Sequence, residues 1–267
     1  MTVNEKYKLY LEAKDAYYNS GTAIMTDSEF DELESWLEAN MVGFDKSVGS
    51  PVKGVAEKFP HWSPMLSLDK VQFGSFKNKS AFMYAVNNKL PKLSNSDYVV
   101  LPKYDGLALN VQYKDGKLFK ALTRGDKTEG RDVKHLLTWL PQNLGLAMDL
   151  EVRGEVVLPT NIFETHSYFK GQQNPRNSAS GLLGRDDYIP EHDLLNFIIF
   201  DVRRYQDNKT FHYDITNSDS WDMFEQYDNI EMAHSIKFVN HINTYDYMLE
   251  YRKRTAYQLD GYVLTTY

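Results

Sequence analysis

One lysine lies in an apolar stretch of the sequence, at a place where chemistry could occur. Lys103 follows Val99 to Pro102 and precedes Asp105 and Gly106 in the run VVLPKYDGLALNVQY. Lysines usually lie where water is plentiful. Either this lysine is an edge charge that reaches solvent from a strand, or it is an amine held in a pocket for reaction. The K-x-D-G tetrapeptide alone favours the structural role, because it occurs by chance in many proteins.

Other reactive residue types recur at the ends of strand-like runs. Arg124 stands in TRGDKTEGRDV, Glu155 in EVRGEVVLP and Asp260 in LDGYVL, each with glycine nearby. Glycine allows the backbone to approach a ligand closely. A lysine, an arginine and a glutamate at three strand ends therefore indicate a nucleotide pocket with a covalent lysine.

The elements that must position these residues follow from hydrophobic periodicity. Residues 4–19 and 26–39 show helical spacing, and Thr26 with Glu29 forms a capping box. From residue 97 the pattern becomes strand-like, with a type I′ turn predicted at Asp115-Gly116. Further helices are predicted at 75–90, 131–140, 160–169, 217–228 and 243–255, and further strands at 151–159, 194–205 and 259–267. The fold class predicted is α+β, with a small helical N-terminal domain followed by a domain of antiparallel sheets flanked by helices.

Composition excludes several classes of protein. The 267 residues include no cysteine, which excludes a disulfide framework and a cysteine-based zinc site. No apolar run is long enough for a membrane span, so we expect no membrane and a cytoplasmic location (host cytoplasm if the source is viral). The formal net charge is −7. Nucleic-acid binding would therefore need clustered basic residues or a second chain.

The ordered set of motifs resembles a known family. HWSPMLSLDK, KYDGLALNVQYKDG, ALTRGDKTEGRDV, EVRGEVVLP, NPRNSASG and LDGYVL resemble, in this order, the NAD-dependent bacterial DNA ligases. KYDG is similar to the nucleotidyltransferase motif of DNA ligases and capping enzymes. The resemblance covers about residue 7 to the last residue. It implies a nicotinamide mononucleotide-binding domain with its connector at 1–70 and a nucleotidyltransferase (adenylation) domain at 71–267.

The reaction implied by the resemblance is the first step of nick sealing in DNA replication and repair. Lys103 would attack NAD, release nicotinamide mononucleotide and form a covalent lysyl-AMP. The attacking amine must be neutral, and burial by the apolar flanks of Lys103 would favour that form. The phosphates would need Mg²⁺ (or Mn²⁺) and arginines.

The resemblance also assigns roles to individual residues. Catalytic roles fall on Lys103 and Asp105, and nucleic-acid contacts on Arg176 and Arg185. Cofactor-binding roles fall on Tyr17, Tyr18, Asp27, Phe30, Asp31, Ser67, Leu68, Arg124, Glu155 and Asp260, and metal ligation falls on Asp105, Asp260 and Glu155. The local sequence fits another interpretation equally well. In that interpretation Tyr17 is a core residue, and Asp27 and Asp31 are acids in the first turn of a helix, which the helix dipole favours.

The sequence departs from the family pattern at several positions. Leu101 stands where the family has an acidic residue, Thr265 where it has a lysine, and Phe30 where it often has tyrosine. Gly184 replaces an arginine, and the neighbouring Arg185 would take that role by a one-residue shift. We expect nicked duplex DNA as a partner, and a second ligase subunit with an OB-fold, because the chain would be an excised fragment or one part of a split ligase.

Two alternatives remain at this stage. A non-catalytic nucleotide-binding module could keep the fold without activity, which Thr265 favours and the intact Lys103 disfavours. An ATP- or GTP-dependent nucleotidyltransferase would leave the N-terminal helices without a role.

Overall fold

The computed structural model describes residues 1–16, 24–44, 57–66, 68, 81, 84, 98–212, 223–237 and 241–266. These residues form two compact units. The first unit comprises residues 1–65 and 105–232, and the second comprises 66–104 and 233–267. Most of the helices predicted at 75–90 and 217–228 lie outside the described residues. The boundary at residues 70 and 71 remains a prediction.

The N-terminal region is a pair of helices, α1 (Val3–Asp15) and α2 (Asp27–Asn40). The predicted capping box begins α2: Thr26 Oγ1 accepts from the Glu29 amide at 3.3 Å, and Glu29 Oε2 accepts from the Thr26 amide at 2.8 Å. The helices pack through a small apolar core that includes Tyr10, Leu33 and Leu37. No helix among the described residues is long and apolar enough to cross a membrane.

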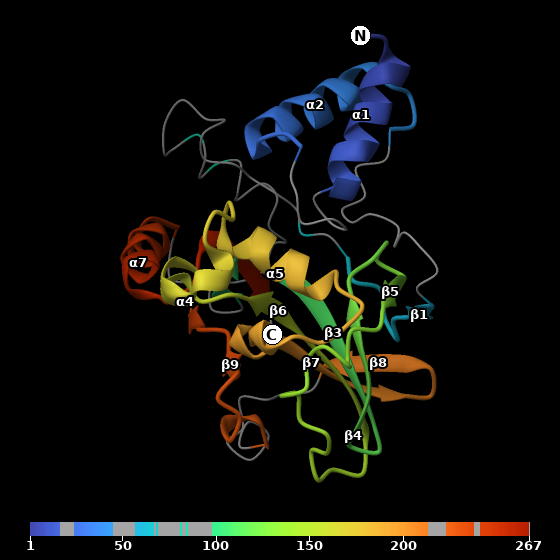
Figure 1. The fold of residues 1–267 in the computed structure, drawn as a ribbon, viewed down its shortest axis with the longest axis vertical. Coiled ribbons are helices and arrows are strands. Elements are labelled where there is room, and N and C mark those ends of the chain that lie inside the picture. Colours follow the sequence, from blue (N-terminus) through green and yellow to red (C-terminus); the bar gives the residue numbers. More distant parts are fainter. Residues whose placement is uncertain are drawn as a thin grey trace. The chain divides into compact units, whose positions relative to one another are not determined.

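A six-stranded, mostly antiparallel sheet forms the centre of the first unit (Figure 1). Its strand order is β4-β3-β6-β7-β8, and β9 pairs with β7 in parallel. The bounds are β3 Leu107–Lys114, β4 Lys117–Thr123, β6 Asp149–Val157, β7 Asn196–Gln206, β8 Lys209–His212 and β9 Ile230–Met232. Asp115 and Gly116 both have positive φ, 46° and 72°, as the predicted type I′ turn between β3 and β4 requires.

Helices and short strands complete this unit. Helix α5 (Pro175–Leu183) packs on β3 and β6 (Figure 1), and α4 (Thr160–Thr165) precedes it. The 3₁₀ turns η4 and η5 span Ser167–Phe169 and Pro190–Leu194. Strand β1 (Lys58–Pro60) pairs with β5 (Glu129–Arg131). The antiparallel α+β architecture predicted from the sequence is thus confirmed at the level of fold class.

The second unit is built on a three-stranded antiparallel sheet. Its order is β10 (Ile236–Lys237), β2 (Tyr98–Tyr104) and β11 (Leu259–Thr266). Helix α7 (His241–Arg254) contributes Met248 to a core with Tyr98 and Val100. The strand predicted at the end of the sequence is therefore β11, which lies at an edge of this sheet as far as the described residues go.

One predicted helix is wrong. Arg131 ends β5, and residues 134–136 and 138–139 form turns, although Val133, Leu136 and Leu137 are fully buried as an apolar helix face would be. Asp132 explains the difference, because its Oδ1 accepts from the amides of Ala121 and Lys134 at 3.2 and 3.1 Å. Side-chain bonds of this kind compete with the helical hydrogen-bond pattern.

Candidate active site

Lys103 lies near the end of β2 and forms an ion pair with Asp260 of β11. In the antiparallel register, Tyr104 faces Leu259 and Lys103 faces Gly261, and the register shifts between Leu259 and Gly261. Asp260 is therefore the additional residue of a β-bulge, a feature that redirects a side chain. Lys103 Nζ donates to Asp260 Oδ2. The amine is thus held by a carboxylate from the neighbouring strand.

Lys103 is not buried, so the burial predicted from its apolar flanks is wrong. Its side chain is 42% exposed, and that of Asp260 is 52% exposed. Successive residues of a strand face opposite sides. Pro102 and Tyr104 are buried on one side, whereas Lys103 shares its side with the half-buried Leu101. The apolar sequence neighbours therefore do not surround the amine.

Gly106 brings the K-x-D-G turn directly against the strand that carries Glu155. A Cβ added to Gly106 would lie 2.2 Å from the Val156 carbonyl oxygen and 2.9 Å from Glu155 Cγ. Any other residue would force the backbone apart at this point. The glycine of the motif is therefore required for the contact between the beginning of β3 and the end of β6.

Asp105 forms an ion pair with Arg176 within the first unit. Arg176 Nη1 lies 2.9 Å from Asp105 Oδ1, and the two side chains are 17% and 26% exposed. Helix α5 positions the arginine in its first turn, after Asn174, whose side chain accepts from the Asn177 amide at 2.7 Å. The structure brings a predicted catalytic carboxylate and a predicted nucleic-acid contact together.

Arg124 follows β4 and is bound through both its side chain and its backbone. Its Nε and Nη2 lie 3.2 and 3.1 Å from the Met65 carbonyl oxygen, and its own carbonyl oxygen lies 3.1 Å from His61 Nε2. The residues that contact it come from about sixty positions earlier in the chain. Arg124 is therefore oriented by the segment that contains HWSPM.

The part of the chain that contains the motifs from HWSPM to LDGYVL matches a known family. Residues 54–266 match the family model of the NAD-dependent DNA ligase adenylation domain. The chain belongs to this family.

Relatives of the adenylation domain come from bacteria and a virus. A DNA ligase of Fusobacterium nucleatum is 36% identical over 200 residues, covering 65% of this chain and 27% of that protein. A DNA ligase of Acanthamoeba polyphaga mimivirus is 29% identical over 265 residues, covering 95% of this chain and 38% of that protein. The chain thus spans about a third of the length of these relatives. A solved ATP-dependent DNA ligase of bacteriophage T7, in complex with ATP, is 15% identical, covers 70% of this chain and 60% of that chain, and has a TM-score of 0.39.

The residues predicted to bind nicotinamide precede the region that matches the adenylation domain, whereas Ser67 and Leu68, predicted to hold the adenosine, lie within it. Phe30 stacks on Tyr10 with ring centroids 5.1 Å apart, so it belongs to the core between α1 and α2. Asp27 and Asp31 lie one turn apart in α2, and their side chains are outside the described part of the structure, as are Tyr17, Tyr18 and Ser67. Leu68 is 60% exposed. Their roles as ligand contacts remain predictions.

Arg185 of the adenylation domain is exposed just after α5. The carbonyl oxygens of Gly184 and Arg185 both accept from the Arg131 guanidinium, which also lies 3.1 Å from Asp186 Oδ1. Arg131 therefore holds the backbone at Arg185, while the Arg185 side chain remains at the surface.

The carboxylates predicted to bind metal are divided between the two units. Among these residues, no group of three or more His, Asp or Glu could hold a metal ion. Asp105 and Glu155 flank the contact at Gly106 in the first unit, whereas Asp260 belongs to the second unit and pairs with Lys103. Mg²⁺ in phosphate-transfer sites commonly uses one or two carboxylates together with phosphates and water. Ligation of Mg²⁺ by Asp105 and Glu155 remains a prediction.

A buried polar network in the adenylation domain was not predicted. Glu151 and Arg153 of β6 form an ion pair at 2.9 Å, with side chains 0% and 7% exposed. Glu151 also accepts from Asn110 at 2.6 Å and from Ser63 Oγ at 2.8 Å. The sequence did contain a signal, because ALNVQ and EVRGE place polar residues at every second position of a strand.

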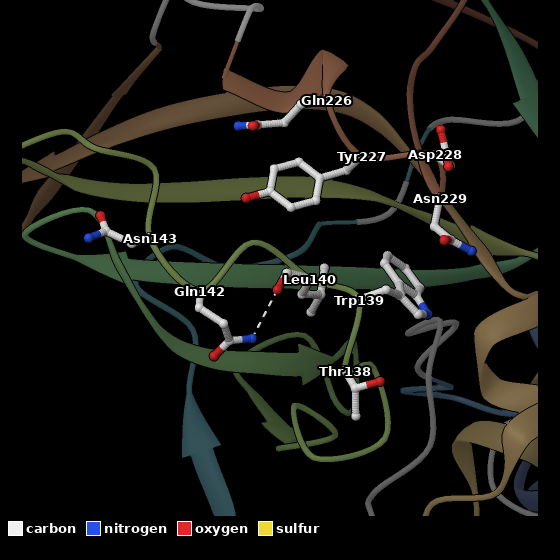
Figure 2. Close-up of a pocket in the computed structure, with 9 residues that line it drawn as sticks. All are labelled: Thr138, Trp139, Leu140, Gln142, Asn143, Gln226, Tyr227, Asp228 and Asn229. Atoms are coloured by element: carbon white, nitrogen blue, oxygen red, sulfur yellow. Dashed lines mark hydrogen bonds between the residues drawn. The ribbon is translucent and has the colours of Figure 1, made fainter.

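A shallow hollow of about 470 Å³ lies elsewhere on the first unit (Figure 2). It is lined by residues 138–140, 142–143 and 226–229. Figure 2 shows the Tyr227 ring between Gln226 and the segment that contains Trp139 and Leu140. None of the residues predicted to bind nucleotide or DNA lines this hollow.

Proposed function

We propose that this chain is the adenylation module of an NAD-dependent DNA ligase, and that Lys103 is its nucleophile. The observation that carries the proposal is the pairing of Lys103 with Asp260 at the end of β2. The carboxylate on the bulge restricts where the Lys103 nitrogen can lie. The family match supports the same assignment.

The proposed reaction transfers AMP from NAD to the lysine. The Lys103 nitrogen forms a bond to the α-phosphorus of NAD, while the bond from that phosphorus to the oxygen of nicotinamide mononucleotide breaks. The amine loses a proton in the process, and Asp260, which accepts from Lys103 Nζ, would orient the amine and receive that proton. The product is a lysyl-AMP phosphoramidate.

The negative charge of the phosphates requires positive partners. Arg124 would line the proposed nucleoside site, and Arg176, which is paired with Asp105, would meet phosphates of the nick. Asp105 and Glu155 would hold Mg²⁺, which when bound neutralises phosphate charge as a Lewis acid. Glu155 would in addition accept from a ribose hydroxyl.

The helix pair α1–α2 would select NAD as the AMP donor. A nicotinamide ring is a flat cation that aromatic and acidic residues attract. Tyr17, Tyr18, Asp27 and Asp31 are the residues proposed to bind it, and Ser67 and Leu68 would hold the adenosine. The Asp31→Ala variant should lose self-adenylation from NAD. If the variant is loaded with AMP beforehand, it should still transfer AMP when a full ligase is supplied.

The acceptor in the full reaction is proposed to be the 5′-phosphate of nicked duplex DNA. The net charge of −7 means that acidic side chains outnumber the basic ones that could bind a duplex backbone. We therefore expect self-adenylation without nick sealing by the purified chain, and sealing only with a second polypeptide or further segment that carries an OB-fold. Robust sealing by the purified chain at low salt would refute this expectation.

The experiment that tests the proposal measures covalent AMP by mass spectrometry. The purified chain should gain the mass of one AMP with NAD and Mg²⁺, and not with ATP. Lys103→Ala should abolish the gain. Lys237→Ala is the matched control, since Lys237 is an exposed lysine on β10 of the same sheet. Labelling of Lys103→Ala would refute the assignment of the nucleophile, and labelling from ATP alone would refute the donor.

A further inference from the structure

The segment 57–66, hereafter the clip, is bound along its length to the turn that contains Arg124. Strand β1 pairs with β5, the His61 amide donates to the Thr128 carbonyl, and the Met65 amide donates to the Lys127 carbonyl, both at 2.9 Å. The Met65 carbonyl then accepts from the Arg124 guanidinium. The clip therefore holds both sides of the Arg124 turn.

His61 lies at the centre of the clip, and both of its ring nitrogens are bonded. Nε2 lies 3.1 Å from the Arg124 carbonyl oxygen, and Nδ1 lies 3.0 Å from Asn110 Nδ2. A carbonyl oxygen only accepts, so Nε2 carries the hydrogen. The Asn110 amide also donates to Glu151 Oε1 at 2.6 Å, which fixes its orientation, so Nδ1 accepts. The geometry requires the neutral Nε2–H tautomer of His61.

We propose that His61 is a positioning residue for Arg124: the neutral Nε2–H tautomer holds the Arg124 backbone, so that the guanidinium stays on the Met65 carbonyl and faces the nucleotide. This inference rests on the proposed function only for the identity of the nucleotide. The positioning itself concerns two residues of the first unit and can be tested without any ligand.

Protonation of His61 would break this arrangement. A second N–H at Nδ1 would point at the Asn110 amide group. Rotating that amide would turn its oxygen toward the Glu151 carboxylate, so neither orientation satisfies all three groups. Asn110 and Glu151 are both 0% exposed, so water does not relieve the conflict.

The groups around His61 both lower and raise its pKa. Burial lowers its pKa from the ordinary 6.5, and Arg153 lowers it further, whereas the Arg124 carbonyl, Glu151 and Asp126 raise it. Burial is the largest of these effects. The lowered pKa therefore favours the neutral form of His61 at physiological pH.

The ligand-free test uses nuclear magnetic resonance of the full chain. The ¹⁵N shifts of His61 should show the neutral Nε2–H tautomer at about pH 7.5. The Arg124 Nε–H signal should be protected from exchange at that pH and should lose protection as pH falls. An Nδ1–H tautomer, or an Arg124 signal that does not respond to the state of His61, would overturn the proposal.

Two substitutions separate the bonds that His61 makes. His61→Gln places an amide N–H near the position of Nε2 and does not titrate, so it should keep Arg124 protected at all pH values. His61→Asn reaches only toward Asn110 and should leave Arg124 unprotected. His135→Gln is the control, because His135 also bonds a backbone carbonyl through Nε2, that of Asp186 at 2.9 Å, but is exposed. Equal behaviour of the Gln and Asn variants of His61 would overturn the proposal.

The nucleotide test measures the kinetics of self-adenylation from NAD. His61→Asn should raise KM for NAD about fivefold, the effect of one lost neutral hydrogen bond, and should leave kcat within about twofold, because Arg124 would contact the ground state as well as the transition state. His61→Gln should have the wild-type KM for NAD. The KM of the wild type should rise at low pH, and that of His61→Gln should not. A change confined to kcat would overturn the proposal. If the wild-type chain is not adenylated at all, the proposed function fails, and the Arg124 signal still decides the role of His61.

Discussion

Asp260 of β11 pairs with Lys103 of β2 at the bulge between Leu259 and Gly261. At this bulge Asp260 and Gly261 together lie opposite Lys103, so the regular alternation of the strand is interrupted there. The proposed nucleophile and its partner thus meet at a backbone irregularity, with both groups open to solvent.

The Asp260→Asn substitution should slow self-adenylation and leave the stability of the fold nearly unchanged. The amide keeps the shape of the side chain but cannot receive a proton, so we expect self-adenylation to slow by about 10²-fold or more. Urea unfolding should change by less than about 1 kcal/mol, because the pair is exposed. Adenylation at the wild-type rate would show that the ion pair has no part in the reaction.

The Gly106→Ala substitution should destabilise the first unit by about 1–3 kcal/mol, since its Cβ would overlap the Val156 carbonyl. It should also displace Glu155 and weaken nucleotide binding. Gly181→Ala in α5 is the matched control, because nothing lies within 4 Å of an added Cβ there. That variant should be stabilised by up to about 1 kcal/mol. Equal effects of the two substitutions on urea unfolding would contradict this account.

The Arg153→Met substitution tests the buried ion pair with Glu151. It leaves a carboxylate with no exposure and without its cationic partner, so we expect a loss of about 3–5 kcal/mol in the free energy of unfolding. The exposed pair Glu250–Lys253 provides the control. Glu250→Gln should change the free energy by less than about 0.5 kcal/mol. Comparable losses in the two variants would mean that burial of the network does not govern its contribution.

The pH dependence of stability should contain a contribution from His61. Its pKa is lowered in the folded state from the ordinary 6.5, so the unfolded chain binds the proton first as pH falls. The contribution is fully present above about pH 6.5 and is lost as pH decreases toward the folded-state value. His61→Gln lacks this dependence. The difference in unfolding free energy between wild type and variant should therefore change below about pH 6.5, and a constant difference would contradict the burial of a neutral His61.

The sequence by itself determined the features that depend on residues close together in the chain. Asp115-Gly116 predicts its turn because both residues tolerate positive φ, and Thr26 with Glu29 predicts the beginning of α2 because the bonds span three residues. The order of the motifs was sufficient to indicate the family. The roles of Lys103 and of the other predicted site residues stay predictions that the experiments above test.

Only the tertiary structure decided which side chains meet. The spacing of apolar residues at 131–140 fits a helix, yet Asp132 binds the amide of Ala121 on β4 and the segment forms turns. Apolar neighbours in sequence suggested a buried Lys103, but the strand directs Pro102 and Tyr104 to the opposite face and leaves Lys103 beside the half-buried Leu101. His61 and Arg124 are 63 positions apart, and nothing local in either segment predicts that they are bonded. Such contacts depend on strand register and on segments that pair across the fold, which the local pattern of residues does not contain.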